Sequence, residues 1–248
     1  MPLPSHPVER HRSLPSTQRR AVELARGGAP VGTTVVAEAQ TGGIGRGDHT
    51  WWSPAGGLYL STIQRFPAHD PGLLSIGVAA ELADRLSGPG RDLHVKWPND
   101  LVVPSEPGPF RKLGGVLVDA LVAPGGERRA VVGVGLNVGR VPDPPPSVNR
   151  RVVSLADLGP PPVTLYELEG LTVDVVGHVT AGLETDEGVR RVRESARRRL
   201  FGKGRAVRLD GRPVGVLVGL ADDGALRVAG RDGPAELRAG DLEFEEGG

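Results

Sequence analysis

The chain has 248 residues, of which 38% are hydrophobic and 24% charged, and its 30 basic and 30 acidic side chains cancel to a formal net charge of zero. That length suits one large domain, or a main domain and a small one, with a sizeable core. The balanced charge argues against broad, sequence-independent nucleic-acid binding. The absence of cysteine excludes a disulfide scaffold, a zinc finger, a thiol nucleophile and an iron–sulfur cluster.

The start of the chain and its hydropathy predict where the protein resides. The first residues lack the apolar stretch of a secretory signal peptide, and no apolar run reaches the roughly 18 residues of a membrane span. We therefore expect a soluble, cytoplasmic protein. Residues 1–12 are rich in proline and arginine, and we expect them to be disordered.

The first half of the chain predicts a mixture of helices and strands. Ser16 or Thr17 can cap a short helix over residues 18–26, which a pair of glycines ends. Apolar residues at helical spacing predict a second helix from Pro71 to about Leu86. Runs of β-branched and apolar residues predict strands over residues 33–37, 58–63, 93–97, 101–103, 112–121 and 129–138, the last two forming a hairpin.

The second half changes pattern near residue 203. Before it, two helices are expected over residues 165–183 and 188–200, the latter rich in arginine. After it, short strands alternate with turns, and Asp-Gly pairs at residues 210 and 223 are typical of hairpins. Five strands predict a small β-barrel, and they cover residues 206–209, 214–220, 225–228, 235–237 and 242–244.

A glycine-rich loop follows the first predicted strand, and residues 40–54 read QTGGIGRGDHTWWSP. Glycines let backbone N–H groups approach an anion closely, and Arg46 adds a bidentate donor for phosphate or carboxylate. The Gly-x-Gly pattern is not a dinucleotide fingerprint, because the residues that follow predict a strand rather than a helix. A flexible hairpin loop without a ligand is the alternative interpretation.

Lysine is scarce, and its positions are informative. Only three of the 30 basic residues are lysines, namely Lys96, Lys112 and Lys203, and asparagine is equally rare. A lysine retained in an arginine-rich chain is a candidate for a role that arginine cannot fill, because lysine is a compact charge on a flexible stem. Residues 96–100, which read KWPND, combine a lysine, a tryptophan and an asparagine. This clustering of rare residue types indicates chemistry.

Two glycines, Gly133 and Gly135, fall on one face of a predicted strand. Glycine weakens a strand unless something packs close to its backbone. Either a flat ligand or a close helix contact would explain the pair. The histidines His49, His69 and His94 lack the spacing of metal ligands, so we expect no fixed metal site.

These motifs together resemble those of the biotin–protein ligases, also called biotin–[acetyl-CoA-carboxylase] ligases. Besides residues 40–54 and 96–100, the resemblance rests on residues 112–117 (KLGGVL) and 133–138 (GVGLNV), and it extends from Ser16 to Phe244. It implies an α/β (α+β) fold: a mixed sheet flanked by helices, related to class II aminoacyl-tRNA synthetases, and a C-terminal SH3-like barrel. The implied domains are a catalytic domain over residues 13–200 and a barrel over residues 201–248.

The resemblance also implies an activity. The family activates biotin with Mg-ATP to biotinyl-5′-AMP and pyrophosphate, and then transfers biotin to one lysine of a carrier. We therefore expect ATP, Mg²⁺ and biotin as ligands, with Mg²⁺ carried by ATP near Asn137. The expected partner is a biotin carboxyl carrier protein or domain. We expect no DNA or membrane partner, an enzyme-only chain without a DNA-binding domain, and a monomer or homodimer.

Site residues follow from the resemblance position by position. The catalytic residues would be Lys112 and Arg46. The biotin-binding residues would be Ser16, Thr17, Gln40, Gly43, Lys112, Gly133 and Gly135. The nucleotide-binding residues would be Arg46, Trp51, Lys96, Asp100, Lys112 and Asn137.

Several positions depart from the family pattern. The family loop carries arginine, glycine and arginine where this chain has Ile44, Asp48 and His49, and it often has asparagine where this chain has Gln18. Asp48 brings negative charge near the expected triphosphate, so weaker nucleotide binding or looser adenylate retention would follow. Two alternatives stay open. One is a lipoate–protein ligase, whose motifs lack the 96–100 string, and the other is a catalytically weakened module that binds biotin or nucleotide.

Overall fold

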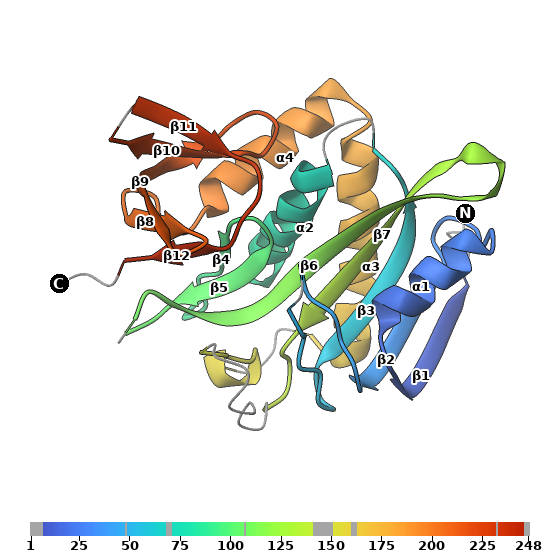
Figure 1. Cartoon of the computed structure of the whole chain (residues 1–248). Coiled ribbons are helices and arrows are strands. Elements are labelled where there is room, and N and C mark those ends of the chain that lie inside the picture. Colours follow the sequence, from blue (N-terminus) through green and yellow to red (C-terminus); the bar gives the residue numbers. More distant parts are fainter. Residues whose placement is uncertain are drawn as a thin grey trace.

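A seven-stranded mixed sheet organises most of the chain (Figure 1). A computed structural model describes residues 7–47, 49–67, 71–106, 108–140, 151–159, 163–231 and 233–245. The strand order is β1-β2-β3-β7-β6-β5-β4, in which β1 and β2 are parallel and the other neighbours antiparallel. The strands are β1 (Val8–Leu14), β2 (Thr34–Gln40), β3 (Leu58–Arg65), β4 (His94–Lys96), β5 (Asp100–Pro104), β6 (Phe110–Val122) and β7 (Arg128–Leu136).

Strand β1 shows that the expectation of disorder is wrong for residues 8–12. The segment pairs with β2 along its length. Arg10 forms a bidentate pair with Glu169 at 2.6 and 2.7 Å, and Glu9 accepts from Arg20 at 2.8 Å. Backbone pairing and these ion pairs order a segment whose composition alone predicts a mobile arm. Residues 1–6 lie outside the described part of the chain.

Helices cover both faces of the sheet, in agreement with the flanked sheet that the resemblance implies. Helices α2 (Pro71–Leu86) and α3 (Leu165–Gly182) pack on one face, and α4 (Asp186–Arg199) packs on α2. Helix α1 (Thr17–Arg26) lies on the opposite face, where it contacts mainly β2, β3 and β7 (Figure 1). Two short 3₁₀ helices occur at Pro124–Gly126 and Ala156–Leu158. Because α1 is short, it leaves part of its face uncovered.

The sequence explains where these helices begin. The Ser16 side chain accepts a hydrogen bond from the backbone of Arg19 and so caps α1, as the sequence predicts. Thr164 and Glu167 form a reciprocal capping box at the start of α3. Thr185 caps α4, which therefore begins two residues earlier than its apolar pattern indicates.

The hydrophobic core is divided by the sheet. A large cluster fills the side of α2 and α3 and continues into the C-terminal strands. A small cluster lies under α1 and consists of Ala21, Ala25, Val35, Ile63 and Val131. The small cluster anchors α1 to one end of its face, which leaves room for a cavity beyond it.

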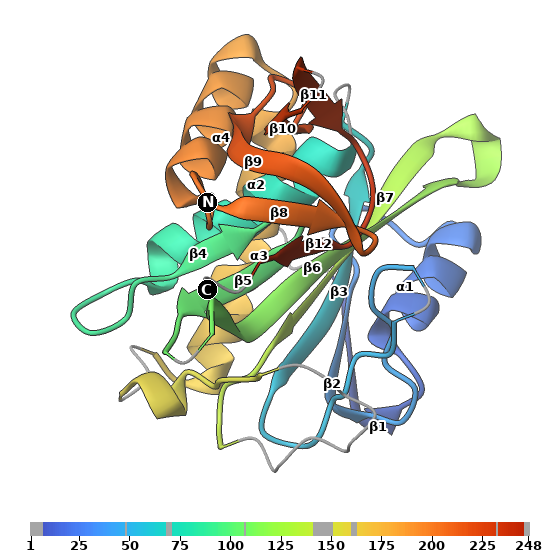
Figure 2. The same cartoon turned by 60° about the vertical axis from the view of Figure 1, so that its left-hand side comes forward.

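The C-terminal strands form a five-stranded antiparallel sheet of order β11-β10-β9-β8-β12, which fits the expected SH3-like barrel. They are β8 (Ala206–Leu209), β9 (Arg212–Leu220), β10 (Leu226–Gly230), β11 (Gly233–Leu237) and β12 (Leu242–Phe244). Figure 2 shows this sheet beside α4 and β4. Phe201 packs edge-to-face against Phe110 and Phe244, with ring centroids 5.7 and 5.2 Å apart. The two sheets therefore share one core, while the exact domain boundary stays a prediction.

Among the described helices, none combines the length and apolarity needed to cross a membrane.

A charged cluster joins α2 to α4. The Asp84 carboxylate accepts hydrogen bonds from Ser195 at 2.7 Å and from Arg198 and Arg199 at 2.6 Å each. Burial alone would raise the pKa of Asp84, but these hydrogen bonds outweigh burial and hold the pKa below its ordinary value of 3.8. A carboxyl group whose pKa is lower in the folded state stabilises the fold above its ordinary pKa, and this contribution is lost as the pH falls through the folded value.

We predict that Asp84→Asn lowers the free energy of unfolding by about 2 kcal/mol at pH 7, because charged hydrogen bonds across the helix interface are lost. The difference from the wild type should shrink as the pH falls below about 3.8. Urea unfolding at several pH values measures both effects. The control Asp92→Asn, whose side chain is 72% exposed, should cost under about 0.5 kcal/mol. Equal costs for the two variants would contradict the prediction.

Candidate active site

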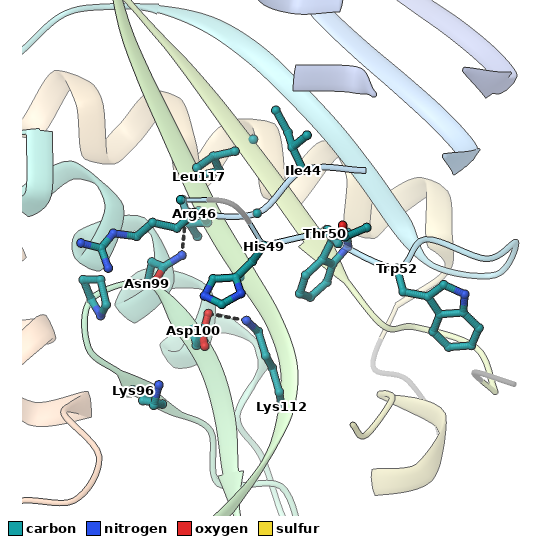
Figure 3. A pocket seen from close by; sticks show the side chains of 18 of the residues that line it. Ile44, Arg46, His49, Thr50, Trp52, Lys96, Asn99, Asp100, Lys112 and Leu117 are labelled. Atoms are coloured by element: carbon teal, nitrogen blue, oxygen red, sulfur yellow. Dashed lines mark hydrogen bonds and ion pairs between the residues drawn. The ribbon is translucent and has the colours of Figure 1, made fainter. Parts of the chain in front are cut away.

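A cavity of about 1210 Å³ lies on the face of the sheet that carries α1. The glycine-rich loop and the C-terminal sheet also contribute to its walls, and Figure 3 shows part of its lining. The structure brings together residues that are far apart in the chain. Eleven of the predicted site residues line the cavity: Ser16, Thr17, Gln40, Arg46, Trp51, Lys96, Asp100, Lys112, Gly133, Gly135 and Asn137.

Gly43 is the exception, because it is buried and does not line the cavity. A β-carbon at this position would lie 2.4 Å from the Trp51 carbonyl oxygen and 2.7 Å from Ser53 Oγ. Glycine is therefore required for the loop to close on itself. Its assigned contact with biotin stays a prediction.

The glycine-rich loop folds as a narrow antiparallel ribbon. Gln40 bridges to Ser53, and the backbone N–H of Trp51 donates to the Gly43 carbonyl at 2.9 Å. Near the tip, Arg46 reaches the C-terminal sheet and donates from Nη1 to the Gly240 carbonyl at 2.8 Å. The guanidinium therefore faces the cavity wall that the C-terminal sheet supplies. Asp48 lies outside the described residues.

A buried ion pair stands in the cavity wall. The Lys112 Nζ atom lies 2.6 Å from Asp100 Oδ1, and the two residues are only 7% and 6% exposed. They come from neighbouring strands, since Lys112 is on β6 and Asp100 begins β5 (Figure 3). The lysine ammonium also lies 5.1 Å from the centroid of the Trp51 ring. This arrangement places a fixed positive charge at the cavity with its counter-charge beside it.

Lys96 stands nearer the C-terminal sheet. Its Nζ atom lies 3.4 Å from Asp241 Oδ1 and 5.8 Å from the centroid of the Phe110 ring. The turn that follows is held by its own side chains, since Trp97 donates to the Gly224 carbonyl at 3.0 Å and Asn99 to the Val116 carbonyl at 2.8 Å. Of the conspicuous 96–100 segment, Trp97 thus joins the two sheets, while the charged residues at its ends contribute to the cavity.

Gly133 and Gly135 are glycines because side chains lie directly on them. A β-carbon at Gly133 would come within 2.3 Å of Gln18 Oε1, and one at Gly135 within 2.6 Å of Trp51 Nε1. Of the two sequence-based interpretations, close packing is therefore observed. The Trp51 indole nitrogen is buried and has no hydrogen-bond partner among the described residues.

Polar side chains converge at the end of the cavity next to α1. Gln40 accepts at Oε1 from the backbone N–H of Thr17 at 2.8 Å and from its hydroxyl at 3.1 Å, and it donates from Nε2 to Ser53 Oγ at 2.8 Å. The Ser61 hydroxyl lies 3.0 Å from Thr17 Oγ1 and 2.9 Å from Gln18 Oε1. These bonds hold the polar groups in fixed directions, which suits a ring that both donates and accepts hydrogen bonds.

Asn137 makes contacts that stabilise the fold of the site. Its Nδ2 atom donates to the Val153 carbonyl at 3.2 Å, and its backbone N–H donates to Leu113 at 2.9 Å. The side chain thereby ties the start of β6 to residues 151–153. Its expected contact with the nucleotide stays a prediction.

The carboxylates near the cavity do not form a metal cage. Within the described part of the chain, no three His, Asp or Glu side chains gather closely enough to hold a metal ion. The Asp100 carboxylate is engaged with Lys112. This donor set fits a Mg²⁺ ion that enters with nucleotide phosphates and keeps its own waters, which is the usual mode for this ion.

A family model confirms what the arranged motifs suggest. The model described as the Biotin/lipoate A/B protein ligase family matches residues 11–137, which is about half of the chain. The chain belongs to the biotin/lipoate A/B protein ligase family. The match contains the glycine-rich loop, the 96–100 turn, Lys112, Gly133 and Gly135, and it ends at Asn137.

Individual relatives extend the family match. The bifunctional ligase/repressor BirA of Bacillus subtilis is 28% identical over 250 residues, covering 94% of this chain and 73% of the relative. The biotin–[acetyl-CoA-carboxylase] ligase of Paracoccus denitrificans is 32% identical over 133 residues, covering 52% of this chain and 53% of the relative. Among solved structures, the biotin protein ligase from Aquifex aeolicus in complex with biotin and ATP has a TM-score of 0.79 at 22% identity, covering 97% of this chain and 99% of that one. The whole described fold, including the C-terminal sheet, is therefore one that this ligase family uses.

Several residues that the fold brings to the cavity have no recognisable role in the sequence motifs. Ser61 lines the cavity, and its signal is a polar residue in the middle of a strand that is otherwise almost wholly buried. Gln18 was noted only as a departure from the family. Gly240 and Asp241 had no local signal, because their contacts with Arg46 and Lys96 join distant parts of the chain.

We predict that Gly135→Ala displaces the Trp51 indole, because the added β-carbon would overlap the ring. The cost should be about 1–3 kcal/mol of stability, with a red-shifted and more readily quenched tryptophan emission. Acrylamide quenching in a Trp52→Phe background measures the displacement. The control Gly219→Ala adds a β-carbon that meets no atom within 4 Å and should leave the emission unchanged. Unchanged quenching in Gly135→Ala would contradict the placement of Trp51.

Proposed function

We propose that the chain is a biotin–protein ligase, which activates biotin with ATP to biotinyl-5′-AMP and pyrophosphate and then transfers biotin to a lysine of a carrier protein. The observation that carries this proposal is one cavity with two unlike parts. A network of buried hydrogen-bonding groups stands beside α1, and the buried Lys112–Asp100 pair stands on strands β6 and β5. The first part suits the ring system of biotin, and the second suits its carboxylate and the α-phosphate of ATP.

The proposed chemistry needs no protein nucleophile. The biotin carboxylate attacks the α-phosphorus of ATP, and pyrophosphate leaves with its bonding electrons. The ε-amine of the carrier lysine then attacks the carbonyl of the mixed anhydride, and AMP leaves. Positioning of the reactants and stabilisation of developing charge are what the protein has to supply.

Lys112 is the residue best placed to stabilise that charge. Its ammonium would contact the carboxylate and the α-phosphate oxygens as the new bond forms. Asp100, 2.6 Å away, holds the lysine in this orientation before the substrates bind. Preorganisation of this kind removes the cost of reorienting the charge during the reaction. Mg²⁺ that is bound with ATP would neutralise part of the negative charge of the phosphates.

Arg46 would hold the adenylate phosphate and shield the mixed anhydride. In the structure its guanidinium donates to the Gly240 carbonyl, and residues of the loop flank it in the cavity lining. Ile44 and His49, two of the departures from the family loop, also line the cavity. These positions offer less positive charge than the arginines of the family, so weaker nucleotide binding or retention is part of the proposal.

A lipoate–protein ligase is the alternative within the same family. Its substrate ends in a dithiolane ring, which has no N–H group and no carbonyl. A dithiolane ring can neither donate to nor accept from the polar network around Thr17 and Ser61, so that network and the ligand would form no hydrogen bond. The network therefore favours biotin, whose ring is a cyclic urea.

The proposal is tested by incubating the protein with biotin, Mg-ATP and the apo form of a biotin carboxyl carrier domain. Intact-mass spectrometry should show one biotinyl group added to the carrier, and none when the carrier lysine is replaced by arginine. A carrier that stays unmodified in the presence of a folded chain would contradict the proposed transfer.

We predict that Lys112→Ala lowers biotin-dependent ATP–pyrophosphate exchange by about 10²–10³-fold, because an oriented charge donor is lost. The control Lys203→Ala removes an exposed lysine outside the cavity and should retain wild-type exchange. Circular dichroism checks that both variants fold. Exchange at the wild-type rate in Lys112→Ala would remove the assigned role.

We further predict that Arg46→Gly releases biotinyl-AMP into solution, because the guanidinium no longer covers the anhydride. Bystander proteins should then become biotinylated on surface lysines, which a streptavidin blot detects. Arg46→Lys keeps the positive charge without the planar fork and should give intermediate labelling. If Arg46→Gly modifies the carrier alone, the loop does not retain the adenylate.

A further inference from the structure

Gln18 occupies an unusual position at the polar end of the cavity. Its side chain is almost fully buried and lies flat on the backbone of Gly133, where a β-carbon would come within 2.3 Å of Oε1. It stands where the family often has asparagine, which is one methylene shorter. The additional length lets the amide extend across Gly133 towards β6.

The direction of the Gln18 amide is fixed by its partners. Nε2 lies 2.9 Å from Asp119 Oδ2 and 3.0 Å from the Val131 carbonyl oxygen. A carboxylate and a backbone carbonyl only accept hydrogen bonds, so the –NH₂ end must face them and both of its hydrogens are used. The amide oxygen is thereby turned towards Ser61 and the cavity. Without Asp119, one of the two contacts that set this direction is lost.

The neighbouring hydroxyl groups leave an acceptor without a full set of donors. The Thr17 hydroxyl donates to Gln40 Oε1, so Thr17 Oγ1 can only accept from its other neighbours. The single Ser61 proton lies between two acceptors, Thr17 Oγ1 at 3.0 Å and Gln18 Oε1 at 2.9 Å. Two buried oxygens thus share one proton. An N–H group of a bound ligand would supply the second.

We propose that Asp119 is a positioning residue for ligand selection, which orients the Gln18 amide so that the buried end of the cavity presents oxygen acceptors. This inference rests on the proposed function and deepens it. The site would select a cyclic ligand with N–H donors, such as the urea ring of biotin, over an acid whose ring has none. Asp119 itself acts through Gln18.

The test compares biotin with an isosteric analogue in which one ring N–H is replaced by oxygen, giving a cyclic carbamate. Isothermal titration calorimetry without ATP measures both affinities. The wild type should bind the carbamate roughly 10–100-fold more weakly than biotin, because an acceptor then faces an acceptor. In Asp119→Ala the ratio of the biotin affinity to the carbamate affinity should fall at least about fivefold. In Asp119→Asn, whose amide oxygen can still accept from Gln18, the ratio should stay close to the wild-type value.

A double-mutant cycle with Gln18→Asn separates positioning from general support of the fold. The shorter amide cannot span the distance to Asp119, so adding Asp119→Ala to Gln18→Asn should change the ratio by less than about twofold. If Asp119→Ala does not fold, Asp119→Leu, which is close in size to aspartate and cannot accept a hydrogen bond, carries the same test with the same expected fall. An unchanged ratio in Asp119→Ala, or an equal loss for both ligands, would overturn the positioning role. A folded wild-type chain that binds no biotin would instead overturn the proposed function.

Discussion

The buried ion pair between Lys112 and Asp100 is the constraint around which the site is built. Two opposite charges that are each under a tenth exposed are tolerated only when they face one another. Their strands must therefore be neighbours, and the register shift between Leu101 and Val102 separates Asp100 from the regular pairing that follows it. The pair places a compact positive charge where anionic substrates would meet. The other residues that line the cavity would position those substrates next to the Lys112 ammonium.

The sheet makes room for this chemistry by dividing its packing unequally. One face carries α2 and α3 over a continuous core, and this side gives the protein its stability. Among the described helices, only the short α1 packs on the other face, over a small apolar cluster. The remainder of that face contributes polar groups, glycines and apolar side chains to the cavity, and the loop and the C-terminal sheet close over it. The structural and functional halves of the molecule are thus opposite faces of one sheet.

Much of this architecture could be predicted from the residues. Helix α2 begins and ends where its apolar spacing places it, at Pro71 and Leu86, and each C-terminal strand falls within two residues of its expected bounds. The rarity of lysine indicates a role for Lys96 and Lys112, and both residues line the cavity. Predictions from local patterns succeed here because periodicity, turns and clusters of rare residue types each depend on residues that are close together in the sequence.

The parts that could not be predicted depend on distant contacts. Residues 8–12 look disordered by composition, and their pairing with β2 and ion pairs with distant side chains order them. The bonds from Arg46 to Gly240 and from Lys96 to Asp241 join positions well over a hundred residues apart, so no local pattern indicates them. The packing of Gln18 on Gly133 and its reach to Asp119 likewise appear only once three elements are assembled.

We propose that this cavity activates biotin as an adenylate. The most direct test of this proposal is ATP–pyrophosphate exchange measured with biotin, lipoate and octanoate in parallel, in the presence of magnesium. Exchange should depend on biotin and should be absent with the other two acids. Exchange with lipoate or octanoate in place of biotin, or no exchange with any acid from folded protein, would contradict the proposal.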